Sequence, residues 1–179
     1  MGTEVARRKF FGRGSIDGRA GLSSRGVPVF GGGDPLLMSK GNVYHVDSGH
    51  ANASDSNEGS SPDRPLATLG AAIAKCTANQ GDIILVSEGH AETTTAAITC
   101  SIAGVRIIGL GEGNSRPAMT VGGAIDGIDI TADDVLIYNL RFPTPTAAAT
   151  SVINIAAARA KILGNWFECG ANAVDVITV

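Results

Sequence analysis

The sequence is poor in aromatic residues and rich in small ones. Phe, Trp and Tyr make up 4% of its 179 residues, whereas 44% are hydrophobic and 24 are glycine. The apolar residues are therefore mainly Ala, Ile, Val and Leu, which suit closely stacked short strands better than a helical bundle. A chain of this size is expected to form one domain with one sizeable core.

Paired cysteines and long apolar runs are also missing. Cys76, Cys100 and Cys169 are odd in number and include no CxxC pair, which argues against both a disulfide framework and a zinc site. We expect them to be small buried hydrophobic side chains. Because no run of about 18 apolar residues and no hydrophobic signal core occur, we expect no membrane partner and synthesis in a cytoplasm-like compartment.

Charge is unevenly distributed along the chain. Residues 1–40 hold seven Lys or Arg and three Asp or Glu, a net charge of +4, so the overall charge of −3 leaves −7 on residues 41–179. The first segment is glycine-rich and has no sustained period, which indicates an extended arm. A basic arm can hold an acidic protein surface, another copy of the acidic body or nucleic acid; the alternative is a solvated tail. Its candidate anchoring residues are Arg7, Arg8, Lys9, Phe10, Phe11, Arg13, Arg19 and Arg25.

The body, residues 41–179, opens with one predicted strand and one predicted helix. Alternation over Asn42–Val46 predicts a strand, and the polar stretch Asp47–Pro65 predicts a loop. Over Leu66–Ala78, apolar residues recur at i, i+3, i+4 and i+7, the stripe of one short amphipathic helix. This stripe consists of Leu69, Ala72, Ile73 and Cys76.

Three later segments resemble one another. Ile98–Leu110, Ile128–Leu140 and Ile153–Asn165 superimpose without gaps at offsets of 30 and 25 residues. A repeat of this length with strand alternation inside it predicts stacked parallel strands, one per coil. The predicted fold class is therefore an all-β solenoid, a right-handed parallel β-helix with one short capping helix and an N-terminal arm. The alignment pairs Ile107 with Ile137 and Ile162, and Phe142 with Phe167.

Both ends of such a stack need a cover, because they expose apolar side chains and unpaired strand edges. The helix at Leu66–Ala78 is well placed to cover the first end. Val174–Val179 is still strand-like, so either the chain is a truncated or processed product or another subunit covers that end. Within the repeats we expect bends with unusual backbone angles at Gly109, Asn139 and Gly164.

The ordered succession of these segments resembles the pectate-lyase-like right-handed β-helices, and specifically those of tailed-phage virion proteins. The resemblance covers about residues 41–179. It implies a homotrimer that either decorates or cements a capsid, with the major capsid protein as partner, or forms part of a tail spike that binds or degrades a host surface glycan. Since this fold hosts many functions, it specifies the activity far less than the architecture. The segments that carry it are Asn42–Asp47, Ser54–Leu69, Gly81–His90 and Val105–Gly111 with Arg116-Pro117.

Enzymes of this group need acids that converge in space. In the repeat alignment, Asp129 corresponds to Thr99 and Asn154, so no column stacks acids across coils. We therefore assign no catalytic residues and interpret Asp133-Asp134 as a turn. No Ser, Cys or His spacing supports a nucleophilic triad either. The acids considered are Asp126, Asp129, Asp133, Asp134, Glu168 and Asp175.

The polar loop and one aromatic residue are the remaining candidates. The loop oxygens could hold Ca²⁺, but their spacing matches no EF-hand, and a solvated loop with Asx turns is the preferred interpretation. The three histidines, His45, His50 and His90, are not spaced as metal ligands, and we expect His45 to pack on the first strand. Trp166 is the candidate contact for a glycan or another subunit. The loop oxygens belong to Asp47, Asp55, Asn57, Glu58 and Asp63.

The favoured hypothesis is therefore a phage virion structural protein rather than an enzyme, assembled in the host cytoplasm and anchored by its arm. The alternative is a tail component that binds or degrades host polysaccharide, for which Trp166 is the candidate. Nucleic acid is a less favoured partner, because only Phe10-Phe11 could stack on bases beside the basic residues of the arm.

Overall fold

The computed structural model describes residues 22–24, 27–29, 39–168, 170 and 172–179. The chain divides into two compact units, Met1–Lys40 and Gly41–Val179. In the first unit, β1 (Leu22–Ser24) pairs antiparallel with β2 (Val27–Val29), a pairing that the sequence analysis did not predict. The predicted anchoring residues lie outside the described residues: Arg7, Arg8, Lys9, Phe10, Phe11, Arg13, Arg19 and Arg25.

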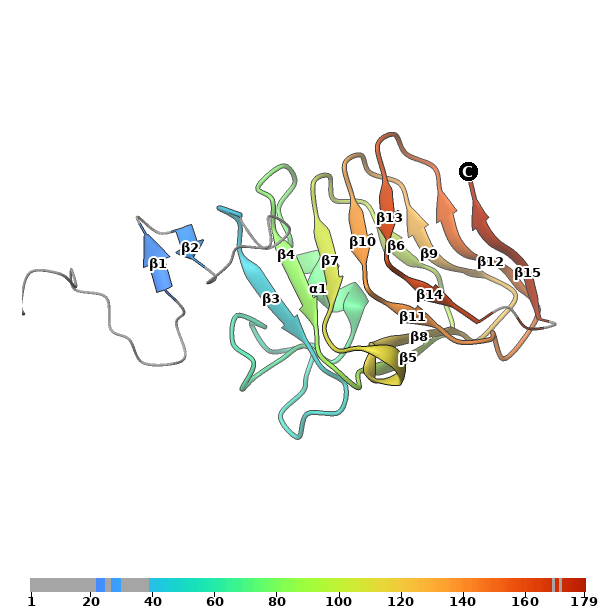
Figure 1. Cartoon of the computed structure of the whole chain (residues 1–179), viewed down its shortest axis with the longest axis horizontal. Coiled ribbons are helices and arrows are strands. Elements are labelled where there is room, and N and C mark those ends of the chain that lie inside the picture. Colours follow the sequence, from blue (N-terminus) through green and yellow to red (C-terminus); the bar gives the residue numbers. More distant parts are fainter. Residues whose placement is uncertain (1–21, 25–26, 30–38, 169, 171) are drawn as a thin grey trace, which may run out of the picture. The chain divides into compact units, whose positions relative to one another are not determined.

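The body consists mostly of strands in three parallel sheets, which we call the first, second and third sheet (Figure 1). The first sheet contains β3 (Val43–Val46), β4 (Ile83–Val86), β7 (Arg106–Gly109), β10 (Leu136–Tyr138) and β13 (Lys161–Leu163). The second contains β5 (Ala91–Thr94), β8 (Ala118–Val121), β11 (Arg141–Phe142) and β14 (Trp166–Phe167). The third contains β6 (Ile98–Cys100), β9 (Asp126–Ile130), β12 (Ala149–Ile155) and β15 (Ala173–Thr178).

From β4 onward the chain visits the three sheets in the same order in each of four successive passes, and every neighbouring pair is parallel. The all-β parallel architecture predicted from the sequence is thus confirmed, and it is compatible with a solenoid. The register also confirms the repeat alignment, since Ile137 lies beside both Ile107 and Ile162. Phe142 lies beside Phe167, and their rings stack with centroids 4.9 Å apart.

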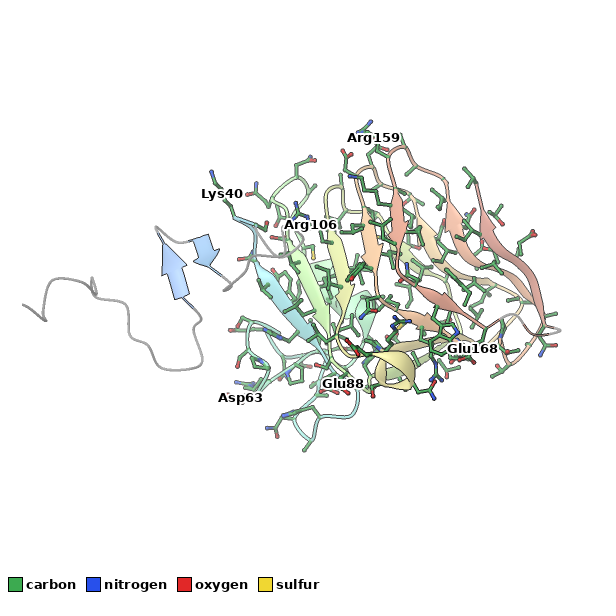
Figure 2. The ribbon with its side chains drawn as sticks, viewed as in Figure 1. Lys40, Asp63, Glu88, Arg106, Arg159 and Glu168 are labelled. Carbon is green, nitrogen blue, oxygen red and sulfur yellow. The ribbon has the colours of Figure 1, made fainter. Side chains whose placement is uncertain are left out.

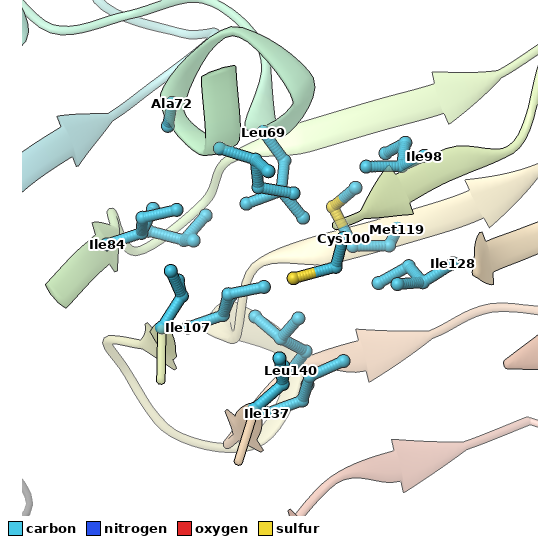
Figure 3. Close-up of a cluster of buried hydrophobic side chains, with 14 of the residues drawn as sticks. Leu69, Ala72, Ile84, Ile98, Cys100, Ile107, Met119, Ile128, Ile137 and Leu140 are labelled. Atoms are coloured by element: carbon cyan, nitrogen blue, oxygen red, sulfur yellow. The ribbon is translucent and has the colours of Figure 1, made fainter. Parts of the chain in front are cut away.

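The core lies between the sheets and is made of aliphatic ladders (Figure 3). Ile84, Ile107 and Ile137 are fully buried on neighbouring strands of the first sheet, and Ile128 and Ile153 are buried on the third. Successive side chains of a strand point to opposite faces, so Ile83, Ile108 and Leu136 lie on the other face of the first sheet, and they are buried as well. Burial of each such side chain contributes about 1.5–3 kcal/mol.

The helix is shorter than the predicted Leu66–Ala78. Among the described residues the single α-helix is α1 (Leu69–Lys75), and the remaining helical segment is the 3-10 turn η2 (Gly113–Ser115). Leu66 instead forms a bridge with Val46, which keeps it extended. Thr68 caps the helix, its Oγ1 accepting a hydrogen bond from the Ala71 N–H at 3.2 Å. The described helices are too short to cross a membrane.

α1 packs against β3, β4 and β6, and its buried stripe of Leu69, Ala72 and Ile73 faces the core (Figure 3). It therefore lies at the start of the third sheet, where β6 has no strand on one side. The apolar stripe predicted from the sequence is confirmed, and the helix covers core residues at the first coils.

The bends follow prediction at two of three positions. Asn139 and Gly164 adopt φ values of 60° and 62°, in the left-handed region. Gly109 is different, because it is the last residue of β7. Glycine is required there because a side chain would not fit, and not because of the φ angle. A Cβ atom at this position would clash with the Asn139 carbonyl oxygen.

Candidate functional site

Asp126 and Asp129, two of the acids considered for catalysis, do not converge. Asp126 and Asp129 lie three positions apart on β9 and so point to opposite faces of the strand. The Asp126 carboxylate accepts a hydrogen bond from the Ser151 hydroxyl at 2.7 Å, and Asp129 accepts one from the Asn154 amide at 2.9 Å. Each acid thus bonds to the equivalent position of the next coil, which is a structural ladder.

Asp133 and Asp134 form the turn predicted for them, with Asp134 at φ 59°. Arg159, from the equivalent turn one coil later, donates to Asp134 at 2.8 Å and to Asp133 at 3.1 Å. The hydrogen bond and the charge of Arg159 hold the pKa of Asp134 below the ordinary value. Because all three side chains are exposed, this ion pair contributes little to stability.

The last two acids lie elsewhere. Glu168 faces Arg141, with Oε1 3.3 Å from the arginine Nε, and Asp175 is an exposed residue of β15 beside Ser151. Figure 2 shows Arg159 and Glu168 on separate parts of the surface. Of the acids considered, the structure therefore brings together Asp133 and Asp134, and both of these bind Arg159 on an exposed turn.

The acids of the loop at 47–65 organise the loop itself. Asp55 accepts hydrogen bonds from the backbone N–H groups of Ala67 and Thr68 at 3.0 and 2.9 Å, just before α1. The Asn57 amide donates to the Pro65 carbonyl at 2.8 Å, and Asp47 accepts from the Gly49 N–H, the Asx turn expected there. Within the part of the chain that the structure describes, no three His, Cys, Asp or Glu side chains are grouped as metal ligands.

A polar cluster that sequence reasoning missed lies where this loop meets β5. The ring of His90 is buried, with 1% of the residue exposed, and its Nδ1 accepts a hydrogen bond from the Ser48 N–H at 2.9 Å. Its Nε2 lies 3.4 Å from Glu92 Oε2 without hydrogen-bond geometry. The same Glu92 oxygen accepts from the N–H of Leu69, the first residue of α1, at 2.9 Å. The sequence signal is only His-x-Glu at the start of a strand, which does not identify distant partners.

A serine, a histidine and a carboxylate are thus neighbours, but they do not form a nucleophilic triad. The Ser48 hydroxyl both donates to the Ala91 carbonyl at 3.0 Å and accepts from the Ala91 N–H at 3.1 Å. The His90 nitrogen near Ser48 is engaged by the backbone and not by the hydroxyl. Nucleophilic catalysis requires the base to contact the hydroxyl, so we interpret the cluster as an anchor of the loop.

A second buried anchor joins β3 to the end of α1. Asp82 is fully buried and accepts hydrogen bonds from the N–H groups of Asn42 and Thr77, each at 2.7 Å. The Tyr44 hydroxyl donates to the Lys75 carbonyl at 2.8 Å, and burial together with the Asp82 charge raises the pKa of Tyr44. The Tyr44 hydroxyl thus satisfies a carbonyl that the helix end would otherwise leave unpaired.

The thiols behave as predicted where they are described. Cys76 and Cys100 are buried, and burial raises their pKa values to about 12 and about 11 respectively. Since the thiolate is the reactive form, both are inert at neutral pH. Cys169 lies outside the described residues. His45 is partly buried on β3, as expected, and burial lowers its pKa.

Trp166 is exposed on the second sheet, with 41% of its surface accessible. The Arg116 guanidinium carbon lies 5.8 Å from the centroid of its ring, within range of a cation–π contact. Arg141 is the neighbour of Trp166 on the adjacent strand. An exposed ring beside two arginines is a surface on which a flat or negatively charged group can bind.

A groove of about 640 Å³ runs beside the outer edge of β3, where Tyr44, Glu58 and Lys75 contribute to its lining. Its lining includes one acid, one base and the hydroxyl groups of Tyr44 and Ser60, a set that does not by itself define a reaction.

Comparison with known proteins gives no further assignment. No protein-family model matches the chain, and neither the curated proteins nor the solved structures contain a match.

Proposed function

We propose that the chain is a structural protein of a tailed-phage virion: a right-handed parallel β-helix that forms a homotrimer and decorates or cements the capsid. In this proposal the first 40 residues anchor it and the major capsid protein is its partner. The protein is assembled in the host cytoplasm and has no catalytic role.

The observation that carries the proposal is the regular body. Four successive passes of the chain through three parallel sheets favour a solenoid. Connections between parallel strands of one sheet are right-handed in about 98% of cases, which favours the right-handed form. In such a body each coil is paired along its length to the next, which is compatible with the role of a scaffold.

Charge supports the anchoring role of the first segment. Residues 1–40 carry +4 and residues 41–179 carry −7, and the two parts form separate compact units. Opposite charge on two units of one polypeptide favours attachment of the basic part to an acidic protein surface. Nucleic acid is a poorer partner, since the acidic body would repel it.

The test is the mass of the full chain by light scattering, with co-sedimentation on shells of the major capsid protein of the same virus. We expect a trimer that binds shells. A matched variant with Arg7→Gln, Arg8→Gln, Lys9→Gln and Arg13→Gln should remain trimeric but lose shell binding. A monomer without affinity for shells would contradict the proposal.

The exposed Trp166 supports a second candidate, a tail component that binds host surface glycan. Aromatic rings stack on sugar faces, and Arg116 would add a charged contact. Trp166 is the sole tryptophan of the chain, so its fluorescence reports directly on this surface. Titration with host polysaccharide fragments should change the emission of the full chain. Arg116→Gln should weaken binding, whereas Arg159→Gln, on the exposed turn, should not.

A further inference from the structure

We propose that His90 is a pH-sensitive latch. Its neutral ring holds the start of the loop at 47–65 against β5, and protonation releases that start while the end of the loop stays attached through Glu92. This inference is independent of the virion role and rests on the position of one buried ring.

The latch joins three segments that are distant in sequence. His90 and Glu92 lie two residues apart at β5, and they bind opposite ends of the loop and its helix. His90 Nδ1 takes the N–H of Ser48, at the start of the loop, at 2.9 Å. Glu92 takes the N–H of Leu69, at the start of α1, at 2.9 Å. The same strand therefore anchors both ends of the segment that covers the first coils.

The partner of Nδ1 fixes the protonation state that this geometry requires. A ring nitrogen that accepts a hydrogen bond carries no proton, so the neutral ring holds its proton on Nε2. A second proton would go to Nδ1 and would face the Ser48 N–H, donor against donor. The ring side chain is fully buried, so no solvent molecule can compensate at the ring surface.

The carboxylate of Glu92, which faces the ring, determines which contacts persist after protonation. Glu92 is the acid within 4 Å of His90 among the described residues, with 3.4 Å between Oε2 and Nε2. A positive ring would attract this carboxylate and leave its bond to the Leu69 N–H in place. The Ser48 hydroxyl, which bonds to the Ala91 backbone, must move with the Ser48 N–H. Protonation therefore loosens the loop start and spares the helix.

The test is hydrogen exchange of the full chain between pH 7.5 and 5, corrected for intrinsic rates and read from a peptide spanning 47–58 and one spanning α1. Loss of one hydrogen bond should lower protection of the 47–58 peptide by about tenfold at the acidic end, with little change in α1. His90→Asn keeps an acceptor near the Nδ1 position but cannot be protonated, so its 47–58 protection should depend on pH less than that of the wild type. The remaining dependence would come from His50, whose Nδ1 accepts a hydrogen bond from the Asn52 N–H at 3.1 Å in the same peptide.

A control variant separates His90 from His50, the other histidine of the loop. His50→Asn, within the same loop, removes this second protonatable acceptor, so the pH response that remains in that variant reports on His90. In case His90→Asn does not fold, histidine NMR of the wild type gives the same answer: the signal of the Nε2-protonated ring should titrate with the same midpoint as the exchange. Equal pH dependence in wild type and His90→Asn, or loosening without titration of that ring, would overturn the latch.

Discussion

The coils are stabilised differently from the cover, by which we mean the loop at 47–65 together with α1. From β4 onward, equivalent residues stack strand upon strand, so that Ile107, Ile137 and Ile162 repeat one contact. The loop and α1 depend instead on polar anchors that each occur once, among them Asp82 and His90. Stability is therefore shared between neighbours in the coils but concentrated in a few side chains in the cover.

The largest effect should come from a charge in the aliphatic ladder. Ile137→Asp places a carboxylate at a fully buried position between two isoleucines, so we expect a loss of more than about 4 kcal/mol and little soluble protein. Leu163→Asp is the matched control, because Leu163 is 47% exposed, and it should change the unfolding free energy by less than about 1 kcal/mol. Urea unfolding measures both. Equal losses would mean that the ladder is not the core of the coils.

The next effect tests the cover. Asp82→Ala leaves the N–H groups of Asn42 and Thr77 without their buried acceptor, at about 1–3 kcal/mol each. We expect a total loss of about 3 kcal/mol in thermal or urea unfolding. Asp63→Ala, at an exposed loop position, should be nearly neutral. A neutral Asp82→Ala variant would show that the cover does not depend on single anchors.

A bend within the coils should show an intermediate effect. Asn139 has φ 60°, and its amide donates to the carbonyls of Gly109 and Gly111 at 2.9 and 3.0 Å. Asn139→Ala should cost about 2 kcal/mol through backbone strain and lost bonds. Asn139→Gly relieves the backbone strain but does not restore the lost hydrogen bonds, so it should be less destabilising than Asn139→Ala. If both variants lose the same amount, the side-chain bonds alone explain the residue.

The smallest expected effect is on the pH dependence of stability. Burial lowers the pKa of His45 in the folded state, so the folded chain binds fewer protons than the unfolded chain as pH falls. Its stability contribution is complete above the unfolded value of about 6.5 and is lost as pH falls toward the lower folded value. Melting temperatures between pH 8 and 5 should fall slightly less for His45→Gln than for the wild type. An identical pH dependence in the variant and the wild type would show that His45 does not contribute to the pH dependence of stability.

Sequence predicted the coils better than the cover, and the helix shows why. Leu66 has the right spacing to belong to the helical stripe, but in the structure it pairs with Val46 and Thr68 caps the helix after it. Helical periodicity cannot predict the competing strand contact, because the partner, Val46, lies 20 positions away in the chain. Gly109 was predicted at a bend, but it is the last residue of β7, and the carbonyl that excludes a side chain there belongs to the next coil.

By itself, the sequence determined the repeat, its register and the residues of the buried ladders, because each coil repeats the same alternation of Ile and Val at matching positions. Only the tertiary structure decided which polar side chains meet at the cover. His90, Glu92, Ser48 and Leu69 come together because the loop folds back onto β5, and no local pattern encodes contacts between residues that are this far apart.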